Sequence, residues 1–203
     1  MRRATRVLAV SLGVFAGFGG PEHGIFEIMR GNVRPQGIMI TSMGPPCNPE
    51  EVWHACEPAM TIVPSFLIAG ILAVIIGIVT MVWAAFFVHR EKGGLVLMLL
   101  SVALLLTGGG LFPPLIGLVA GAVGTRINAP VSRRRNRLSD LLAKLWPWPL
   151  VAFFVWTLGQ FVIGYFFNDF LLESGFLSPL LILGLVVLAV ASAFARDAQR
   201  RVS

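Results

Sequence analysis

The chain has 203 residues, of which 56% are hydrophobic and 13% are charged. An ordinary soluble domain has about 25% charged residues, so this composition excludes a typical water-soluble protein. The formal net charge of +6 would suit nucleic acid, but the basic residues lie in short stretches beside long apolar runs, as membrane orientation signals do. The composition predicts an integral membrane protein whose main partner is the lipid bilayer, with no nucleic acid.

Four uncharged stretches set the fold class: residues 58–88, 93–125, 145–168 and 174–195. About 20 apolar residues suffice to cross a bilayer, and a backbone in lipid must form its hydrogen bonds internally. The runs lack the alternation of barrel strands, so we expect helices. The sequence therefore predicts an all-α fold, a polytopic transmembrane helical bundle with about six membrane segments and a small external loop cap, forming a single membrane domain over 1–203.

Segment one is predicted at 7–20, directly after a basic start. It is short enough to fit a signal peptide as well, but residues 14–20 offer no clean small-x-small cleavage site, which favours a retained segment. Residues 21–59 are polar and rich in proline and glycine, so we expect an extracytoplasmic loop there. Segment two follows at 60–88.

The stretch 93–125 is too long for one crossing and short for two. A cluster of helix breakers near its centre predicts a helical hairpin, segments three and four. The cluster comprises Gly108, Gly109, Gly110, Pro113 and Pro114. Two interpretations stand: an external turn, which we favour, or a re-entrant hairpin whose open backbone binds an ion or an anionic ligand.

Residues 126–145 are predicted to form a basic cytoplasmic loop, with a short amphipathic helix at 138–145 lying on the membrane surface. Segments five and six follow at 146–167 and 176–195. Every Lys and Arg except Arg30 and Arg34 then falls on one side. The positive-inside rule therefore predicts that both termini are cytoplasmic. We expect the membrane to be a plasma (inner) membrane, with anionic lipid headgroups as partners at its cytoplasmic face.

The two cysteines, Cys47 and Cys56, both lie in the predicted external loop. An oxidising compartment permits a disulfide between them, which is the interpretation we favour. The alternative is a metal site that combines the two thiolates with His54 and His23, because thiolate and imidazole suit borderline metals. Their spacing matches no strong zinc motif.

A second candidate site combines His23, Glu27, His54 and Glu57. His23 and Glu27 are four residues apart and would share one face of a helix. The first two residues follow segment one and the last two precede segment two, so antiparallel packing of these segments would bring all four together. Imidazoles and carboxylates there could bind a divalent cation or shuttle a proton. The plainer alternative is a solvated rim, with Arg30 paired to Glu27.

Small and polar residues within the apolar runs predict close helix packing. Gly13-x-x-x-Gly17 and Gly117-x-x-x-Gly121 would let helices approach closely within the monomer, and Gln160 would form an interhelical hydrogen bond. The same apolar runs contain no Asp, Glu, Lys or Arg. Because buried ionisable groups usually mark proton pathways, this absence argues against a pump.

Sequence alone leaves three classes of function open. The favoured class is a structural or accessory subunit of a membrane complex, with a protein partner or a homo-oligomer. The first alternative is a small-solute or ion transporter or channel that uses the broken hairpin at 108–114. The second is a membrane-embedded enzyme with the outer-face His/Glu site, which the lack of common catalytic motifs disfavours. No cofactor is predicted.

Overall fold

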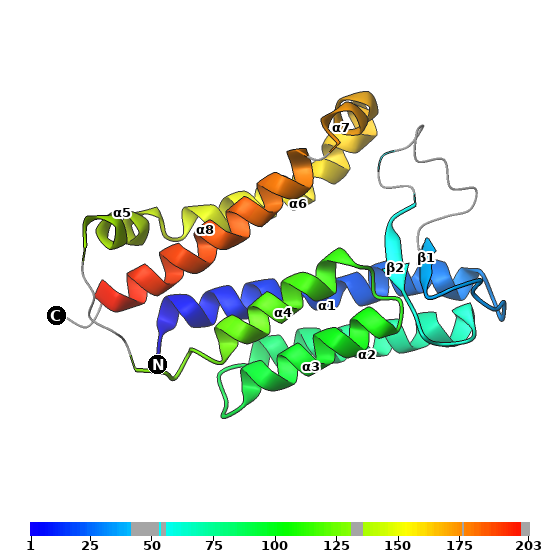
Figure 1. The fold of residues 1–203 in the computed structure, drawn as a ribbon, viewed down its shortest axis with the longest axis horizontal. Helices are drawn as coiled ribbons and strands as arrows, with labels where there is room; N and C mark the ends of the chain where they lie inside the picture. Colours follow the sequence, from blue (N-terminus) through cyan, green and yellow to red (C-terminus); the bar gives the residue numbers. More distant parts are fainter. Residues whose placement is uncertain (42–52, 54–55, 131–135, 176, 200–203) are drawn as a thin grey trace. The chain divides into compact units, whose positions relative to one another are not determined.

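The computed structural model describes residues 1–41, 53, 56–130, 136–175 and 177–199 (Figure 1). Most of these residues are helical, which confirms the all-α class, and one small two-stranded sheet accompanies the helices. The elements in chain order are α1 Arg3–Met29, β1 Met39–Thr41, β2 Pro58–Met60, α2 Phe66–Phe86, α3 Gly93–Leu106, α4 Phe112–Gly124, α5 Arg137–Leu145, α6 Trp148–Phe166, α7 Asn168–Ser174 and α8 Leu177–Gln199.

Among the described residues, α1, α2, α6 and α8 are each long and apolar enough to cross a membrane. Helices α3 and α4 are apolar but have only 14 and 13 residues. The described chain forms two compact units, and the single membrane domain over 1–203 stays a prediction. The N-terminal unit comprises 9–41 and 56–128, and the C-terminal unit comprises 1–8, 53 and 129–199.

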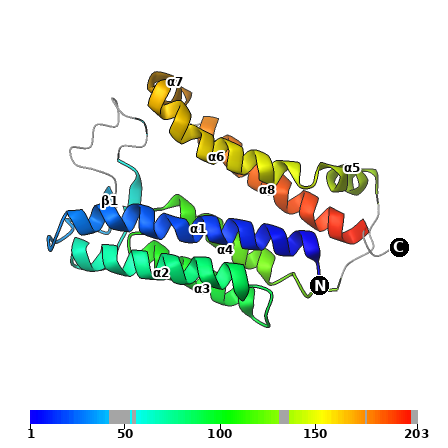
Figure 2. The same ribbon diagram turned by 180° about the vertical axis from the view of Figure 1, so that it is seen from behind.

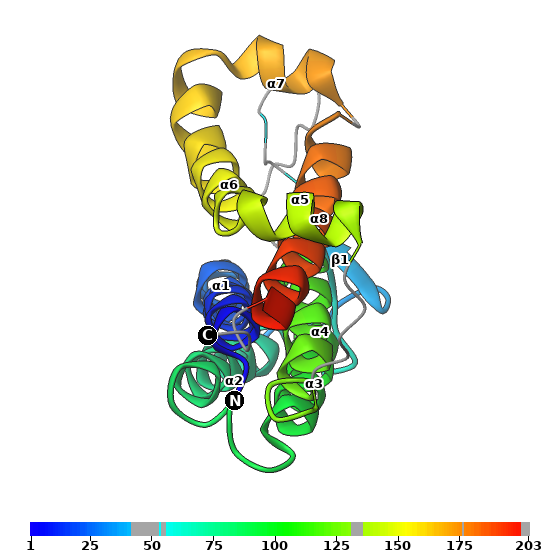
Figure 3. The same ribbon diagram turned by 90° about the vertical axis from the view of Figure 1, so that its left-hand side faces the viewer.

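The N-terminal unit is an up-and-down arrangement of α1 to α4. Short connections at 87–92 and 107–111 make α2, α3 and α4 antiparallel neighbours. Figure 3, which looks along the helices, shows the four at the corners of one group, with α1 beside α2 and α4. At the beginning of α2, the Ser65 hydroxyl accepts a hydrogen bond from the backbone N–H of Ile68 at 3.5 Å and caps the helix.

Helices α1 and α2 are packed backbone to backbone through glycine. A Cβ atom built on Gly17 would lie 2.7 Å from the carbonyl oxygen of Gly77, and one on Gly24 would lie 2.7 Å from that of Gly70. Both distances are far below normal carbon–oxygen contact, so only glycine permits this separation. The predicted intramolecular role of the Gly13 and Gly17 pair is therefore confirmed.

The same packing explains why α1 is longer than the predicted segment 7–20. Pro21 lies inside the helix and cannot donate to the carbonyl of Gly17, which normally favours a break. A Cβ atom built on Gly77 would lie 2.5 Å from the Gly17 carbonyl oxygen, so this oxygen lies close to the Cα of Gly77. A Cα–H···O contact of this kind compensates in part. Nine residues predicted as loop, 21–29, thus belong to α1.

The segment after α1 returns to the helices through β1 and β2. The two strands pair antiparallel, with Ile40 opposite Ala59, and Thr61 continues into an isolated bridge with Thr107. The small sheet is therefore attached to the turn between α3 and α4. Residues 31–33 are held at the start of α2, where Phe66 N–H donates to the Val33 carbonyl at 2.9 Å.

In the C-terminal unit, α6 and α8 form an antiparallel hairpin, visible from behind in Figure 2. Gln160 of α6 accepts a short hydrogen bond from the Ser178 hydroxyl of α8, as the interhelical role predicted for Gln160 requires. Trp156 Nε1 donates to the same hydroxyl at 3.2 Å. Helix α7 lies between the predicted segments five and six, and α5 matches the predicted short helix.

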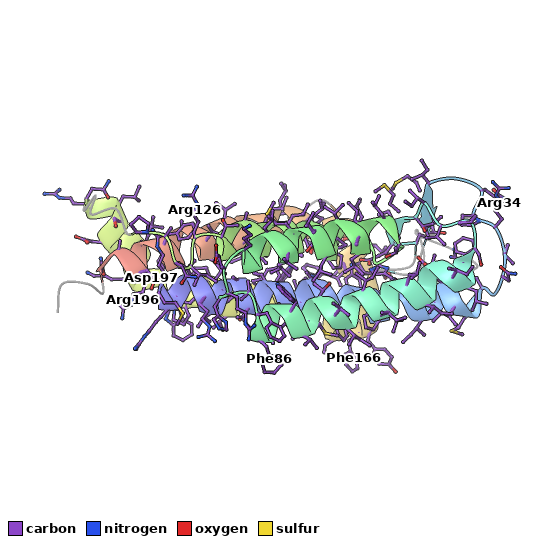
Figure 4. The ribbon with its side chains drawn as sticks, turned by 90° about the horizontal axis from the view of Figure 1, so that it is seen from below. Arg34, Phe86, Arg126, Phe166, Arg196 and Asp197 are labelled. Carbon is purple, nitrogen blue, oxygen red and sulfur yellow. The ribbon has the colours of Figure 1, made fainter. Side chains whose placement is uncertain are left out.

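A buried carboxylate links the end of α8 to the beginning of α1. Asp197 accepts hydrogen bonds from the backbone N–H of Ala4 at 3.0 Å, and from the backbone N–H and hydroxyl of Thr5, both at 2.8 Å. These N–H groups have no acceptor within the first turn of a helix, and a negative charge there also suits the helix dipole. Figure 4 labels Asp197 at this end of the chain, beside Arg196.

Candidate functional site

The candidate site is built on the last two turns of α1. His23 and Glu27 lie four residues apart on this helix and therefore share one face. Their side chains are almost completely enclosed, at 1% and 0% exposure. Enclosure of an ionisable side chain is costly and is usually retained only where it serves a function or is compensated.

The turn between α3 and α4 covers both side chains with glycine. Gly108 and Gly110 have positive φ angles of 94° and 79°, a region that favours glycine. A Cβ on Gly108 would overlap both carboxyl oxygens of Glu27, and one on Gly110 would overlap the imidazole of His23. The two glycines are therefore needed twice over, for their backbone conformation and for the close approach to the site.

Strand β2 and the residue after it bind the backbone of this turn. Gly108 N–H donates to the Met60 carbonyl at 2.9 Å, Leu111 N–H to the Pro58 carbonyl at 3.0 Å, and Ile62 N–H to the Leu106 carbonyl at 3.0 Å. Irregular backbone in a membrane protein persists only where protein or water covers it. In this structure the strand β2 covers the backbone of residues 108–111. This favours the interpretation as a turn over the interpretation as a re-entrant hairpin that binds an ion.

The two prolines of the predicted break lie in the first turn of α4 and are buried. Proline is tolerated there because the first helical N–H groups have no acceptor within the helix. Pro113 also contacts α1, since a Cβ on Gly19 would lie 2.7 Å from its Cγ atom. The helix breakers thus serve both to end α3 and to pack the turn against α1.

Glu57 connects the enclosed pair to the surface. Its Oε2 atom lies 3.3 Å from Nε2 of His23, and its side chain is 30% exposed. An imidazole accepts a proton on one nitrogen and releases one from the other, so it suits transfer between carboxylates. Glu57 is thus a partly exposed acid beside the buried His23, and Glu27 is a fully buried acid one helical turn further along α1.

Arg30 does not form the ion pair with Glu27 that the sequence allowed. Its guanidinium group lies over the Phe66 ring, 4.8 Å from the ring centre. Among the described residues, both carboxyl oxygens of Glu27 lack a hydrogen-bond donor. A solvated polar rim is therefore the wrong description of Glu27, because burial beneath the glycine turn removes it from water.

The predicted site residues thus fall into two groups. The structure brings His23, Glu27 and Glu57 together, whereas His54 and Cys47 lie outside the described residues. Cys56 is described and has a positive φ of 78°. Within the described ranges, no group of three or more His, Cys, Asp or Glu side chains could hold a metal ion. The disulfide between Cys47 and Cys56, and a metal site using His54, stay predictions.

Two features of this architecture were absent from the sequence-based site. The triglycine turn was predicted only as a break, because no local pattern indicates which helix a loop will cover. Asp197 lies beyond the end of the predicted segment six, at 195. An acidic residue near the C-terminus of a helix opposes the helix dipole, and that conflict is a sequence signal for a carboxylate with a partner elsewhere in the fold.

No family model, curated protein or solved structure matches this chain. Functional assignment therefore rests on the chemistry of the site and on the membrane character of the helices.

Proposed function

We propose that this chain is a polytopic membrane protein of the transporter or channel class, in which proton exchange at Glu57, His23 and Glu27 controls the passage of a small solute. One observation carries the proposal: a buried histidine and a buried glutamate of an apolar helix lie beneath a glycine turn, with a partly exposed glutamate 3.3 Å from the histidine. Ionisable groups within membrane helices typically mark proton or ion pathways.

The geometry favours a proton over a metal ion as the species bound. The glycine turn fits against Glu27 and His23 so closely that a single added methyl group would overlap them. A divalent cation needs several ligands around it, and none of the described residues forms such a group. A proton needs only one lone pair and a neighbouring donor or acceptor, which the Glu57 and His23 pair supplies.

The proposal includes a topology and a location. The chain has six membrane segments, both termini are cytoplasmic, and the membrane is a plasma (inner) membrane. The support is the positive-inside rule and the connectivity of the N-terminal unit. Arg126, in the predicted basic loop, and Arg34, in the predicted external loop, lie at opposite ends of that unit (Figure 4). Helices α3 and α4 would enter from the cytoplasmic side and turn beneath an external cap formed by β1 and β2, near the outer boundary.

The extension of α1 weakens the accessory-subunit alternative. That alternative was favoured because the apolar runs contain no ionisable residue and the chain contains no common catalytic motif. Since α1 continues to Met29, it carries His23 and Glu27 in buried positions. The enzyme alternative uses the same His23 and Glu57 pair as a general base, and a covalent product or substrate turnover without solute flux would favour it.

The test is proton uptake into liposomes that contain the purified chain and an internal pH-sensitive dye, driven by a potassium diffusion potential. We expect uptake above that of empty liposomes, with at least a tenfold loss in Glu27→Gln and in Glu57→Gln. Glu91→Gln, which changes an exposed acid between α2 and α3, is the matched control and should retain the wild-type rate. Wild-type uptake equal to that of empty liposomes would reject the proposal.

Infrared spectroscopy tests the site independently of flux. A protonated carboxyl group has a C=O stretching band that a carboxylate lacks. We expect such a band in the wild type, sensitive to deuterium exchange and missing from Glu27→Gln, with no change in Glu91→Gln. Co-purification of a second protein in fixed ratio, without proton uptake by the isolated chain, would instead support the accessory subunit.

A further inference from the structure

Helix α5 presents an apolar face outward, away from the helix that holds it. Leu138, Leu141 and Leu145 are 62%, 61% and 44% exposed, and their spacing of three and four residues places them on one face. On another face Ala143 is buried, and Asp140 accepts a hydrogen bond from Gln199 of α8 at 2.8 Å. The attachment to α8 thus fixes the direction in which the leucines point.

Two cations accompany this leucine face. Arg137 and Lys144 are both exposed and lie seven residues apart, so they occupy one side of the helix, next to the leucines. In the sequence, three further arginines immediately precede α5 at 133–135. An apolar stripe with cations beside it is the pattern of helices that lie in the interface of an anionic membrane.

The position of α5 in the chain also indicates that its leucine face contacts lipid. Helix α6 begins at Trp148, only three residues after α5 ends, and is long and apolar enough to cross a bilayer. The beginning of a membrane-spanning helix lies at the membrane boundary, so α5 must lie there too. Its nine residues, about 14 Å in length, are too few to cross, and Trp148 is 68% exposed, as interfacial tryptophans often are.

We propose that α5 is an in-plane helix that binds the surface of an anionic lipid bilayer. Its leucines insert at the level of the acyl chains, and Arg137 and Lys144 bind headgroup phosphates. This inference does not depend on the proton site proposed for the N-terminal unit. Hydrogen bonding of Asp140 to Gln199 transmits the anchoring of α5 to the end of α8.

Thermal unfolding of the full chain in nanodiscs tests the electrostatic part. We expect the unfolding midpoint to be higher by about 4 °C or more in phosphatidylglycerol-containing discs than in pure phosphatidylcholine discs. Arg137→Gln with Lys144→Gln should abolish most of this difference, and the charge-preserving pair Arg137→Lys with Lys144→Arg should keep it. Equal midpoints of the wild type in both lipids, or an unchanged difference in the glutamine variant, would overturn the proposal.

Photocrosslinking tests the occupant of the leucine face. With a benzophenone amino acid in place of Leu141, illumination in nanodiscs should give a lipid adduct detectable by mass spectrometry. The same amino acid in place of Arg34, an exposed loop residue, is the control and should give a several-fold lower lipid yield. A crosslink at residue 141 to a second copy of the chain, or to another protein, in place of lipid would overturn the proposal.

Discussion

The two units hold their helices together by different means. In the N-terminal unit, α1 and α2 meet through the glycine positions 17, 20, 24, 70 and 77, so that one backbone lies against the other. In the C-terminal unit, Gly159 and Gly184 have no atom within 4 Å of a Cβ position, and the helices carry large exposed side chains such as Val155 and Val187. The second unit instead buries larger side chains such as Phe153 and Ile182 and adds single polar contacts, among them Gln160 with Ser178.

This difference shows what each kind of interface allows. Glycine contacts shorten the distance between backbones, so a loop such as 108–110 closes directly over His23 and Glu27 and excludes water from them. An interface of large side chains with a few hydrogen bonds tolerates more variation and leaves its outer face to lipid. We therefore expect substitutions in the first unit to be more severe than matched substitutions in the second.

The largest effect is expected from Gly77→Ala. A Cβ there would lie 2.5 Å from the Gly17 carbonyl oxygen and 2.8 Å from the Gly20 Cα, both backbone atoms that cannot move aside. The free energy of unfolding should fall by about 3 kcal/mol, as for other overpacked interiors. Gly184→Ala is the matched control, because it is helical with open space around it and should gain about 0.5–1 kcal/mol. Denaturant unfolding in detergent measures both; equal changes would contradict the comparison.

Gly108→Ala should follow, with a loss of about 2 kcal/mol, because its backbone is left-handed and its Cβ overlaps Glu27. Gly31→Ala separates the two causes. Gly31 has a φ of 74° but open space, so it should lose only about 1 kcal/mol. The double variant Glu27→Ala with Gly108→Ala no longer has the overlap between the new Cβ and the Glu27 carboxyl group. Part of the lost free energy of unfolding should therefore return. A strictly additive double-mutant cycle would show that Gly108 and Glu27 do not interact.

Asp197→Ala should cost about 1–2 kcal/mol, the usual effect of losing a helix N-cap. The expected loss arises because the N–H groups of Ala4 and Thr5 are buried and lose their acceptor. Asp197→Asn retains one oxygen acceptor and should lose less. The control is Asp169→Ala, an exposed acid in the first turn of α7, which should change stability by less than about 0.5 kcal/mol. Thermal unfolding ranks the three variants.

The smallest effect is expected for the polar contact between α6 and α8. Gln160→Ala, Ser178→Ala and the double variant form a cycle whose coupling should be about 0.6 kcal/mol, the average for interhelical hydrogen bonds in membranes. Unfolding in the same detergent gives all four values. A coupling as large as the loss in Gly77→Ala would mean that the C-terminal unit depends on this contact as strongly as the N-terminal unit depends on glycine.

The sequence predicted helix positions well where apolar runs had clear ends. The predicted hairpin at 93–125 corresponds to α3 and α4, and the amphipathic pattern at 138–145 corresponds to α5. The predicted end of segment one at residue 20 was wrong, because Pro21 and Gly24 by themselves indicate a loop whereas α1 continues to Met29. Proline and glycine weaken a helix locally, but close packing on α2 outweighs that local preference.

Apolar run lengths, the positions of Lys and Arg and the helix breakers at 108–114 are properties of neighbouring residues, and they sufficed to determine a helical membrane protein with a broken hairpin. The sequence also named His23, Glu27 and Glu57 as members of one candidate site, but their burial and the glycine turn that covers His23 and Glu27 were decided only by tertiary structure. His23, Glu57 and Gly108 are far apart in the chain. No local sequence pattern indicates that the turn at Gly108 will cover α1, or that the segment leading into β2 will place Glu57 beside His23. Burial depends on all the elements that pack around a residue, so it appears only once those elements have assembled.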